Sequence, residues 1–139
     1  MFKNILVPTD FSDNDRNALN IAVKICSVEN GKIHLLHVIE VIANTTFDEF
    51  KDFYTKLEKR SFKDLNGMIA PFQGGQADMV PAVGYGNRAQ EILRYAHEHQ
   101  IDLIIMKSHR IDVEDRAQGW GTISYKVGIL AQCPVMLVK

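Results

Sequence analysis

The chain has 139 residues, which suits one domain with a sizeable core. Its 16 basic and 17 acidic side chains leave a net charge of −1, so composition gives no general attraction to nucleic acid or to anionic membranes. No apolar run approaches the roughly 20 residues that span a bilayer, and the N-terminal apolar run is too short for a signal peptide. We therefore expect one cytoplasmic domain over residues 1–139, with no nucleic-acid or membrane partner.

Short apolar segments predict strands, and amphipathic segments between them predict helices. The run Asn4-Ile-Leu-Val7 predicts the first strand, and 32–39 predicts the second. Ser12, followed three residues later by Asp15, is the expected N-cap of the helix between them, which Asn30-Gly31 should end.

A long helix is predicted over about 46–69, because large apolar side chains recur there at spacings of three to five residues. We expect these side chains to pack in the core: Phe47, Phe50, Tyr54, Leu57, Phe62, Leu65 and Met68. The third strand, 77–83, contains Pro81, which cannot donate to a strand ladder, so we expect this strand at a sheet edge. Gly84 and Gly86 should form the turn after it.

The rest of the chain continues the alternation, with a helix at about 88–100, a strand at 102–107, a loop to about 118, a helix at about 119–132 and a last strand at 135–138. Such alternation predicts an α/β fold with a parallel sheet and helices on both faces. Cys26 and Cys133 form no CxxC pair and no two histidines share a face, so we expect free thiols and no metal site.

The polar residues that follow the first and fourth predicted strands are the candidates for a binding site. In a parallel α/β sheet, ligands lie outside the carboxyl ends of the strands. Asp10 follows the first strand, and Lys107 ends the fourth. The Asp10 carboxylate could accept hydrogen bonds from a ribose hydroxyl or could cap the next helix, and its position alone leaves both open.

Five segments together resemble the universal stress protein family. They are Asn4-Ile-Leu-Val-Pro-Thr-Asp-Phe-Ser12, Leu35-Leu-His-Val-Ile39, Gly86-Asn-Arg-Ala-Gln-Glu-Ile-Leu93, Ile101-Asp-Leu-Ile-Ile-Met106 and Cys133-Pro-Val-Met-Leu-Val138. The resemblance runs the full length of the chain in matching order. It implies a single Rossmann-like domain with a five-stranded parallel sheet of order 3-2-1-4-5, which agrees with the edge position argued from Pro81.

Some members of this family bind ATP through a loop written G-x-x-G, nine residues, then G followed by Ser or Thr. On this chain the first two glycines fall on Lys107 and Arg110, and ten residues rather than nine precede Gly121-Thr122. Ser108-His109 resemble the dipeptide that the binders often carry between the glycines. Asp10 and Val38 match the residues that binders place near the ribose and the adenine.

Long side chains in place of glycine add bulk where phosphates approach the backbone and make a positive φ costly. The bases of this segment are balanced by acids: Lys107, Arg110 and Arg116 against Asp112, Glu114 and Asp115. We expect the basic side chains to be tied to these carboxylates, so ATP should not bind strongly. Weak binding of an adenine nucleotide such as AMP stays open, because Asp10 and Val38 are retained.

The last strand should lie at the second sheet edge, where an uncovered apolar strand is a liability. Pairing of Val135, Met136, Leu137 and Val138 with a second copy would cover it, so we expect a homodimer. No catalytic set stands out. The sequence therefore favours a dimeric regulatory module, not an enzyme, that has no cofactor and is open to a protein partner. The alternative is an adenine-nucleotide switch that uses Asp10, Val38, Lys107, Ser108, His109, Arg110, Gly121 and Thr122.

Overall fold

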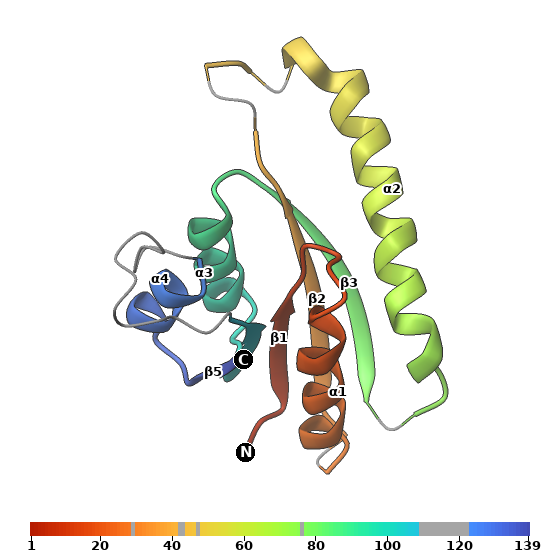
Figure 1. The fold of residues 1–139 in the computed structure, drawn as a ribbon, viewed down its shortest axis with the longest axis vertical. Coiled ribbons are helices and arrows are strands. Elements are labelled where there is room, and N and C mark those ends of the chain that lie inside the picture. Colours follow the sequence, from red (N-terminus) through yellow and green to blue (C-terminus); the bar gives the residue numbers. More distant parts are fainter. Residues whose placement is uncertain (29, 42–43, 47, 76, 109–122) are drawn as a thin grey trace.

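One parallel sheet runs through the molecule in the order β3-β2-β1-β4-β5 (Figure 1). The computed structural model describes residues 1–28, 30–41, 44–46, 48–75, 77–108 and 123–139. The strands are β1 (Asn4–Pro8), β2 (Lys32–Ile39), β3 (Asp78–Tyr85), β4 (Leu103–Lys107) and β5 (Val135–Val138). All four pairings are parallel, so the predicted strand order and α/β class are confirmed.

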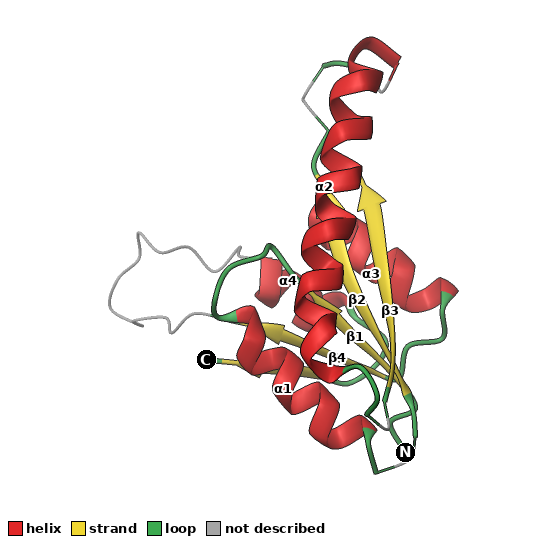
Figure 2. Ribbon diagram, turned by 90° about the vertical axis from the view of Figure 1, so that its right-hand side faces the viewer, coloured by secondary structure: helices red, strands yellow, loops and turns green. Residues whose placement is uncertain are grey.

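Helices cover both faces of this sheet, as Figures 1 and 2 show. The helices are α1 (Asp15–Cys26), α2 (Lys51–Ile69), α3 (Arg88–Glu98) and α4 (Ile123–Leu130), with short 3-10 turns at Asp48–Phe50 and Ala70–Phe72. α1 and α2 pack on one face, and α3 and α4 pack on the other. Among the described residues, no helix has both the length and the apolar character needed to cross a membrane.

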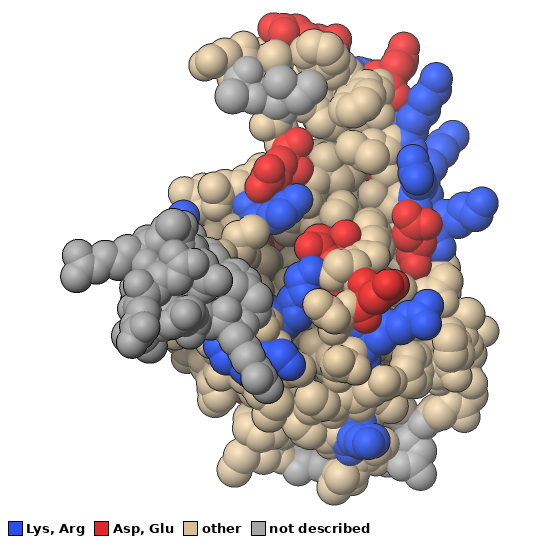
Figure 3. Space-filling view, viewed as in Figure 1, with Lys and Arg blue, Asp and Glu red and all other residues tan. Residues whose placement is uncertain are grey.

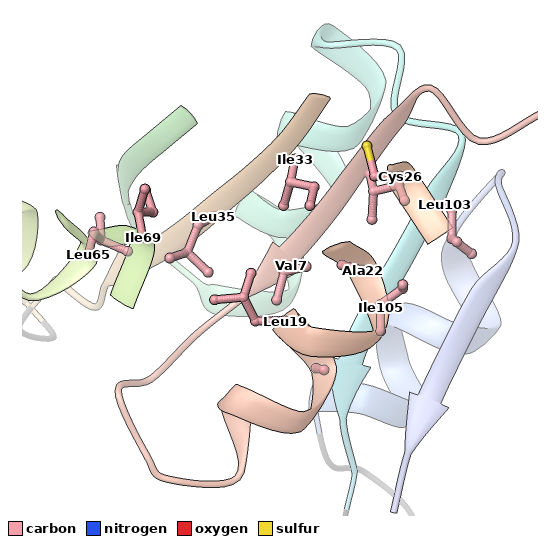
Figure 4. Packing of buried hydrophobic residues seen from close by; sticks show 12 residues of the cluster. Val7, Leu19, Ala22, Cys26, Ile33, Leu35, Leu65, Ile69, Leu103 and Ile105 are labelled. Atoms are coloured by element: carbon pink, nitrogen blue, oxygen red, sulfur yellow. The ribbon is translucent and has the colours of Figure 1, made fainter. Parts of the chain in front are cut away.

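Two apolar clusters, one on each face of the sheet, form the core. The first lies under α1 and α2 (Figure 4) and includes Val7, Leu19, Ala22, Ile33, Leu35, Leu65 and Ile105. The second lies under α3 and α4 and includes Leu6, Leu36, Val38, Ile92, Ile104, Met106 and Val127. Alternate residues of the same strand enter different clusters, because successive side chains of a strand point to opposite faces. Burial on both faces explains why the central strands are continuously apolar.

Several element boundaries differ from the sequence prediction. β3 extends to Tyr85, so Gly84 lies within the strand and only Gly86, with a φ of +130°, serves the turn. α3 ends at Glu98 rather than near residue 100. The predicted start of the last helix, 119–122, lies outside the described residues, which place α4 from Ile123.

The prediction that Ser12 caps α1 is wrong. The helix begins at Asp15, and the residue at the N-cap, Asn14, makes no side-chain cap hydrogen bond. Ser12 instead donates its N–H to Asp10 at 3.0 Å. Asp15 turns its carboxylate back toward the end of β1, where it orders the turn described below.

The expected apolar face of the long helix is only partly in the core. Tyr54 and Leu65 are fully buried, but Phe50 is 38% exposed, contrary to the prediction. Figure 2 shows that the N-terminal part of α2 extends beyond the sheet, so a residue before α2 finds little of the sheet to pack against. Phe47 lies outside the described residues.

Candidate functional site

A cavity of about 470 Å³ opens at the carboxyl ends of β1, β2 and β4. Its volume falls within the range of about 300–1,000 Å³ that is typical of small-molecule sites. Its apolar lining residues are Leu36, Val38, Ile92, Met106 and Ile123. Its polar lining residues include Asp10, Asp15, Arg88, Lys107, Ser108, Ser124 and Lys139. Figure 3 shows charged side chains of both signs gathered on this side of the molecule.

The turn that follows β1 is held by its own side chains. The hydroxyl of Thr9 donates to Asp15 Oδ2 at 2.6 Å, and the N–H of Asp10 donates to the same oxygen at 3.0 Å. The N–H of Phe11 in turn donates to the Thr9 hydroxyl at 3.0 Å. These bonds hold Phe11 at a φ of +67°, a conformation that a side chain other than glycine adopts at a cost of the order of 1 kcal/mol.

Asp10 and Lys107 form an ion pair across the carboxyl ends of two neighbouring strands. Lys107 Nζ donates to both carboxylate oxygens of Asp10, at 2.6 and 2.7 Å, and also to the hydroxyl of Ser12. Burial opposes ionisation of Asp10, but the hydrogen bonds from Lys107 and Ser12 outweigh it and hold the pKa of this carboxyl well below its usual range. Lys107 is therefore tied to an acid at the end of the neighbouring strand β1. Asp112, Glu114 and Asp115, the acids of its own loop, lie outside the described residues, so that expectation stays a prediction.

Asp15 is the residue of this site whose role the sequence did not reveal. Its side chain is fully buried, and burial raises the pKa of its carboxyl, with the Thr9 hydroxyl and Lys107 acting against this. Asp15 Oδ1 accepts no hydrogen bond from the described part of the chain and lies 3.8 Å from Lys107 Nζ. The only signal in the sequence was the spacing of Asp15 from Ser12, which was interpreted as a capping box.

Two buried serines and a lysine form a further part of the cavity wall. Ser124, in the first turn of α4, donates to the Ser108 hydroxyl at 3.1 Å. Lys139 Nζ lies 3.4 Å from the same hydroxyl and 2.8 Å from the Tyr125 hydroxyl. At the cavity mouth, Arg88 pairs with Glu40 at 3.4 Å. This wall can offer hydroxyl and ammonium donors to an anion.

Half of the predicted nucleotide-binding residues fall in the described part of the chain, and these lie together. Asp10, Val38, Lys107 and Ser108 all line the cavity. The other four, His109, Arg110, Gly121 and Thr122, lie outside the described residues. Besides Asp15, the sequence analysis missed Arg88, Ser124 and Lys139. These three residues lie far apart in the sequence, so only the fold could bring them to one cavity.

Comparisons with known proteins agree with the motifs and the fold. The model of the universal stress protein family matches residues 1–139. Universal stress protein YxiE of Bacillus subtilis (strain 168) is 30% identical over 154 aligned positions that cover all of both chains. The solved structure of universal stress protein UspA from Lactobacillus plantarum has 26% identity and a TM-score of 0.74, over 99% of this chain and 98% of the other. The hypothetical protein MJ0577 also has 26% identity, with a TM-score of 0.84 over 100% and 96%.

Two solved structures that are less similar to this chain are described as complexes with a nucleotide. One is a universal stress protein in complex with cAMP, at 18% identity and a TM-score of 0.68 over 99% of this chain and 96% of the other. The other is the universal stress protein from Archaeoglobus fulgidus in complex with dAMP, at 16% identity and a TM-score of 0.60 over 99% and 98%. At these identities the likeness shows a common fold. The full-length family match, the curated relative and the five-stranded fold show that this chain belongs to the universal stress protein family.

Proposed function

We propose that this protein is a cytoplasmic regulatory module of the universal stress protein family that works as a dimer, does not hold ATP strongly and catalyses no reaction. The observation that carries the proposal is the contact of Lys107 Nζ with both carboxylate oxygens of Asp10. Asp10 is the acid that would receive the ribose hydroxyls. Because both oxygens of this acid already accept hydrogen bonds from Lys107, the ribose hydroxyls must compete with an ammonium group for them.

The penalty of that displacement is modest, because both side chains are partly exposed to solvent. The side chain of Asp10 is 40% exposed and that of Lys107 is 32% exposed. Ion pairs of this kind contribute up to about 1 kcal/mol, which corresponds to about a fivefold loss of affinity. The ion pair therefore weakens the binding of a nucleotide without preventing it. Lysine in place of the first glycine, at position 107, weakens the contacts with the phosphates further.

A second candidate, an adenine-nucleotide switch, is favoured by the shape and lining of the cavity. Its apolar lining could receive a base, and Arg88 and Lys139 supply cations for one phosphate group. The complexes of two distant structural neighbours with cAMP and dAMP support a monophosphate rather than a triphosphate as the ligand class. In this version the dimer would respond to the level of a nucleoside monophosphate.

Calorimetric titration with ATP and magnesium tests the first candidate. The purified protein should release no stoichiometric nucleotide on denaturation, as read by mass spectrometry, and should bind ATP with a millimolar rather than micromolar Kd. Lys107→Met should tighten ATP binding about fivefold, because it frees Asp10. Lys126→Met is the matched control, since Lys126 is an exposed lysine that does not line the cavity. Micromolar ATP affinity of the unmodified protein would overturn the first candidate.

A further inference from the structure

The ammonium group of Lys107 lies in a nest of oxygen atoms supplied by three consecutive parts of the chain. Asp10, directly after β1, presents both carboxylate oxygens to it at 2.6 and 2.7 Å. The turn adds the hydroxyl of Ser12, and the first residue of α1 adds Asp15 Oδ1 at 3.8 Å. Two carboxylates of like charge thus converge on a single cation.

The buried carboxylate of Asp15 separates this arrangement from an ordinary surface ion pair. Asp15 has no exposed surface, and its Oδ2 already accepts hydrogen bonds from Thr9 and Asp10. Its Oδ1 accepts none from the residues described in 1–108 and 123–139, although it is buried and lies 3.8 Å from Lys107 Nζ. A buried polar atom without a partner is costly, so the nest holds one more oxygen than the lysine uses.

The arrangement of oxygens resembles the one that a hard divalent cation requires. Ca²⁺ is bound by carboxylates, often through both oxygens of one group, and by neutral oxygens at 2.3–2.6 Å. The two contacts from Asp10 have this bidentate form and are only slightly longer. Within the described residues no group of three acidic, His or Cys side chains could hold a metal, so two carboxylates are the limit here. The tethered ammonium already occupies the centre of the nest.

We propose that Lys107 is a specificity-determining residue whose ammonium stands in the place of a divalent cation. The cleft then takes a phosphate ester as the free anion rather than as a metal complex. This ligand class rests on the second candidate function. The role of Lys107 itself rests on the geometry alone. Because the ammonium is attached to the chain, its effective concentration in the nest is high, and a metal ion must compete with it. The positive charge of the ammonium also repels a metal ion that approaches.

Calorimetric titration with Ca²⁺ alone tests the role of Lys107. The unmodified protein should show no binding at millimolar Ca²⁺, whereas Lys107→Met should bind one Ca²⁺ at least tenfold more tightly. Lys107→Arg is the matched control, because it keeps a positive charge and should not bind Ca²⁺. Adding Asp10→Asn to the Met variant should abolish the new site. Circular dichroism verifies that each variant is folded, and Lys107→Gln replaces Lys107→Met if the latter is not.

The proposal is overturned if the folded Met and Gln variants bind Ca²⁺ no better than the unmodified protein, or if the unmodified protein binds it equally well. AMP titrated with EDTA and then with magnesium provides the second readout. Equal affinity in both conditions supports a free anion as the ligand, and a tenfold gain with magnesium contradicts it. If AMP does not bind at all, the second candidate function fails, while the calcium titration still decides the role of Lys107.

Discussion

His34, on β2, is a polar side chain that burial forces to stay neutral. The residue is only 6% exposed, its Nδ1 lies 2.6 Å from the hydroxyl of Tyr95, and its Nε2 has no hydrogen-bond partner among the residues that the structure describes. Burial lowers the pKa of His34 to about 4, helped by the positive charges of His99 and Lys32 and opposed by Asp78. The His34 ring also forms T-shaped contacts with the rings of Tyr95 and His99, which stack on each other with ring centroids 3.8 Å apart.

Acid should therefore destabilise the protein through this residue. The unfolded chain takes up a proton on His34 near pH 6.5, whereas the folded protein does so only near pH 4. Stability is thus fully present above pH 6.5 and is lost as the pH falls toward 4. Between pH 7 and pH 4.5 the loss should be about 2 kcal/mol in the free energy of unfolding, measured with urea. His34→Gln serves as the reference, since it cannot titrate. A variant that loses as much stability as the unmodified protein would show that other groups cause the effect.

Residue identity was sufficient to predict some members of the site but not their contacts. Asp10 and Lys107 were chosen because they lie at strand ends that meet at one edge of the sheet, and Val38 and Ser108 were chosen from the resemblance to the family; all four line the cavity. The partner of Lys107 was not predictable, because it is set by the pairing of β1 with β4 rather than by neighbours in sequence. The role of Asp15 depends on the left-handed turn at Phe11, which no local pattern announced.

At the scale of elements, α3 shows how a local signal fixes a helix end. Gly86 lies in the left-handed region, and Asn87 follows as the N-cap, where its Oδ1 accepts a hydrogen bond from the N–H of Gln90 at 3.1 Å. The helix then places Ala89 and Ile92 against the sheet and lines one side of the cavity. The cap therefore stabilises both the helix and one wall of the site.

Asn87→Ala should destabilise the protein by about 1 kcal/mol, because the first turn of α3 loses the side-chain acceptor for one of its free N–H groups. Urea unfolding measures this loss directly. Asn87→Ser keeps an acceptor oxygen and should remain within a few tenths of a kcal/mol of the unmodified protein. If serine is as destabilising as alanine, the cap hydrogen bond is not what Asn87 contributes.

Strands were easier to predict than helix ends, for a physical reason. The central strand β2 is buried on both faces, so its whole length is marked by apolar residues and 32–39 was placed with the observed bounds. The bounds of 135–138 also match, although β5 lies at a sheet edge and is only partly buried. Helix α2 carries the same apolar spacing beyond the sheet, where no surface remains to cover it. The exposure of Phe50 therefore depends on how far the neighbouring sheet extends. The spacing of apolar residues within one helix carries no information about that.

At the scale of the whole molecule, the sheet has two edges of different character. β3 forms one edge and contains Pro81, whose missing N–H is tolerated there. β5 forms the other edge. It is short and apolar, and Met136 is 37% exposed. Parallel pairing of β5 with β4 uses the carbonyls of Pro134 and Val138, so by alternation along the strand Val135 and Leu137 direct their backbone groups to the open edge.

The proposed homodimer requires backbone hydrogen bonds between two copies at this open edge. If two copies pair through β5, the N–H of Leu137 should donate to the second copy, and Leu137→Pro should convert a dimer into a monomer by removing that donor. The ladder to β4 would be kept, because Leu137 does not take part in it on that side. Leu137→Ala is the matched control, since it removes more of the apolar side chain but keeps the N–H, and it should remain dimeric. Size-exclusion chromatography with light scattering at tens of micromolar decides the matter. A monomeric unmodified protein, or a dimeric proline variant, would show that β5 is not the contact.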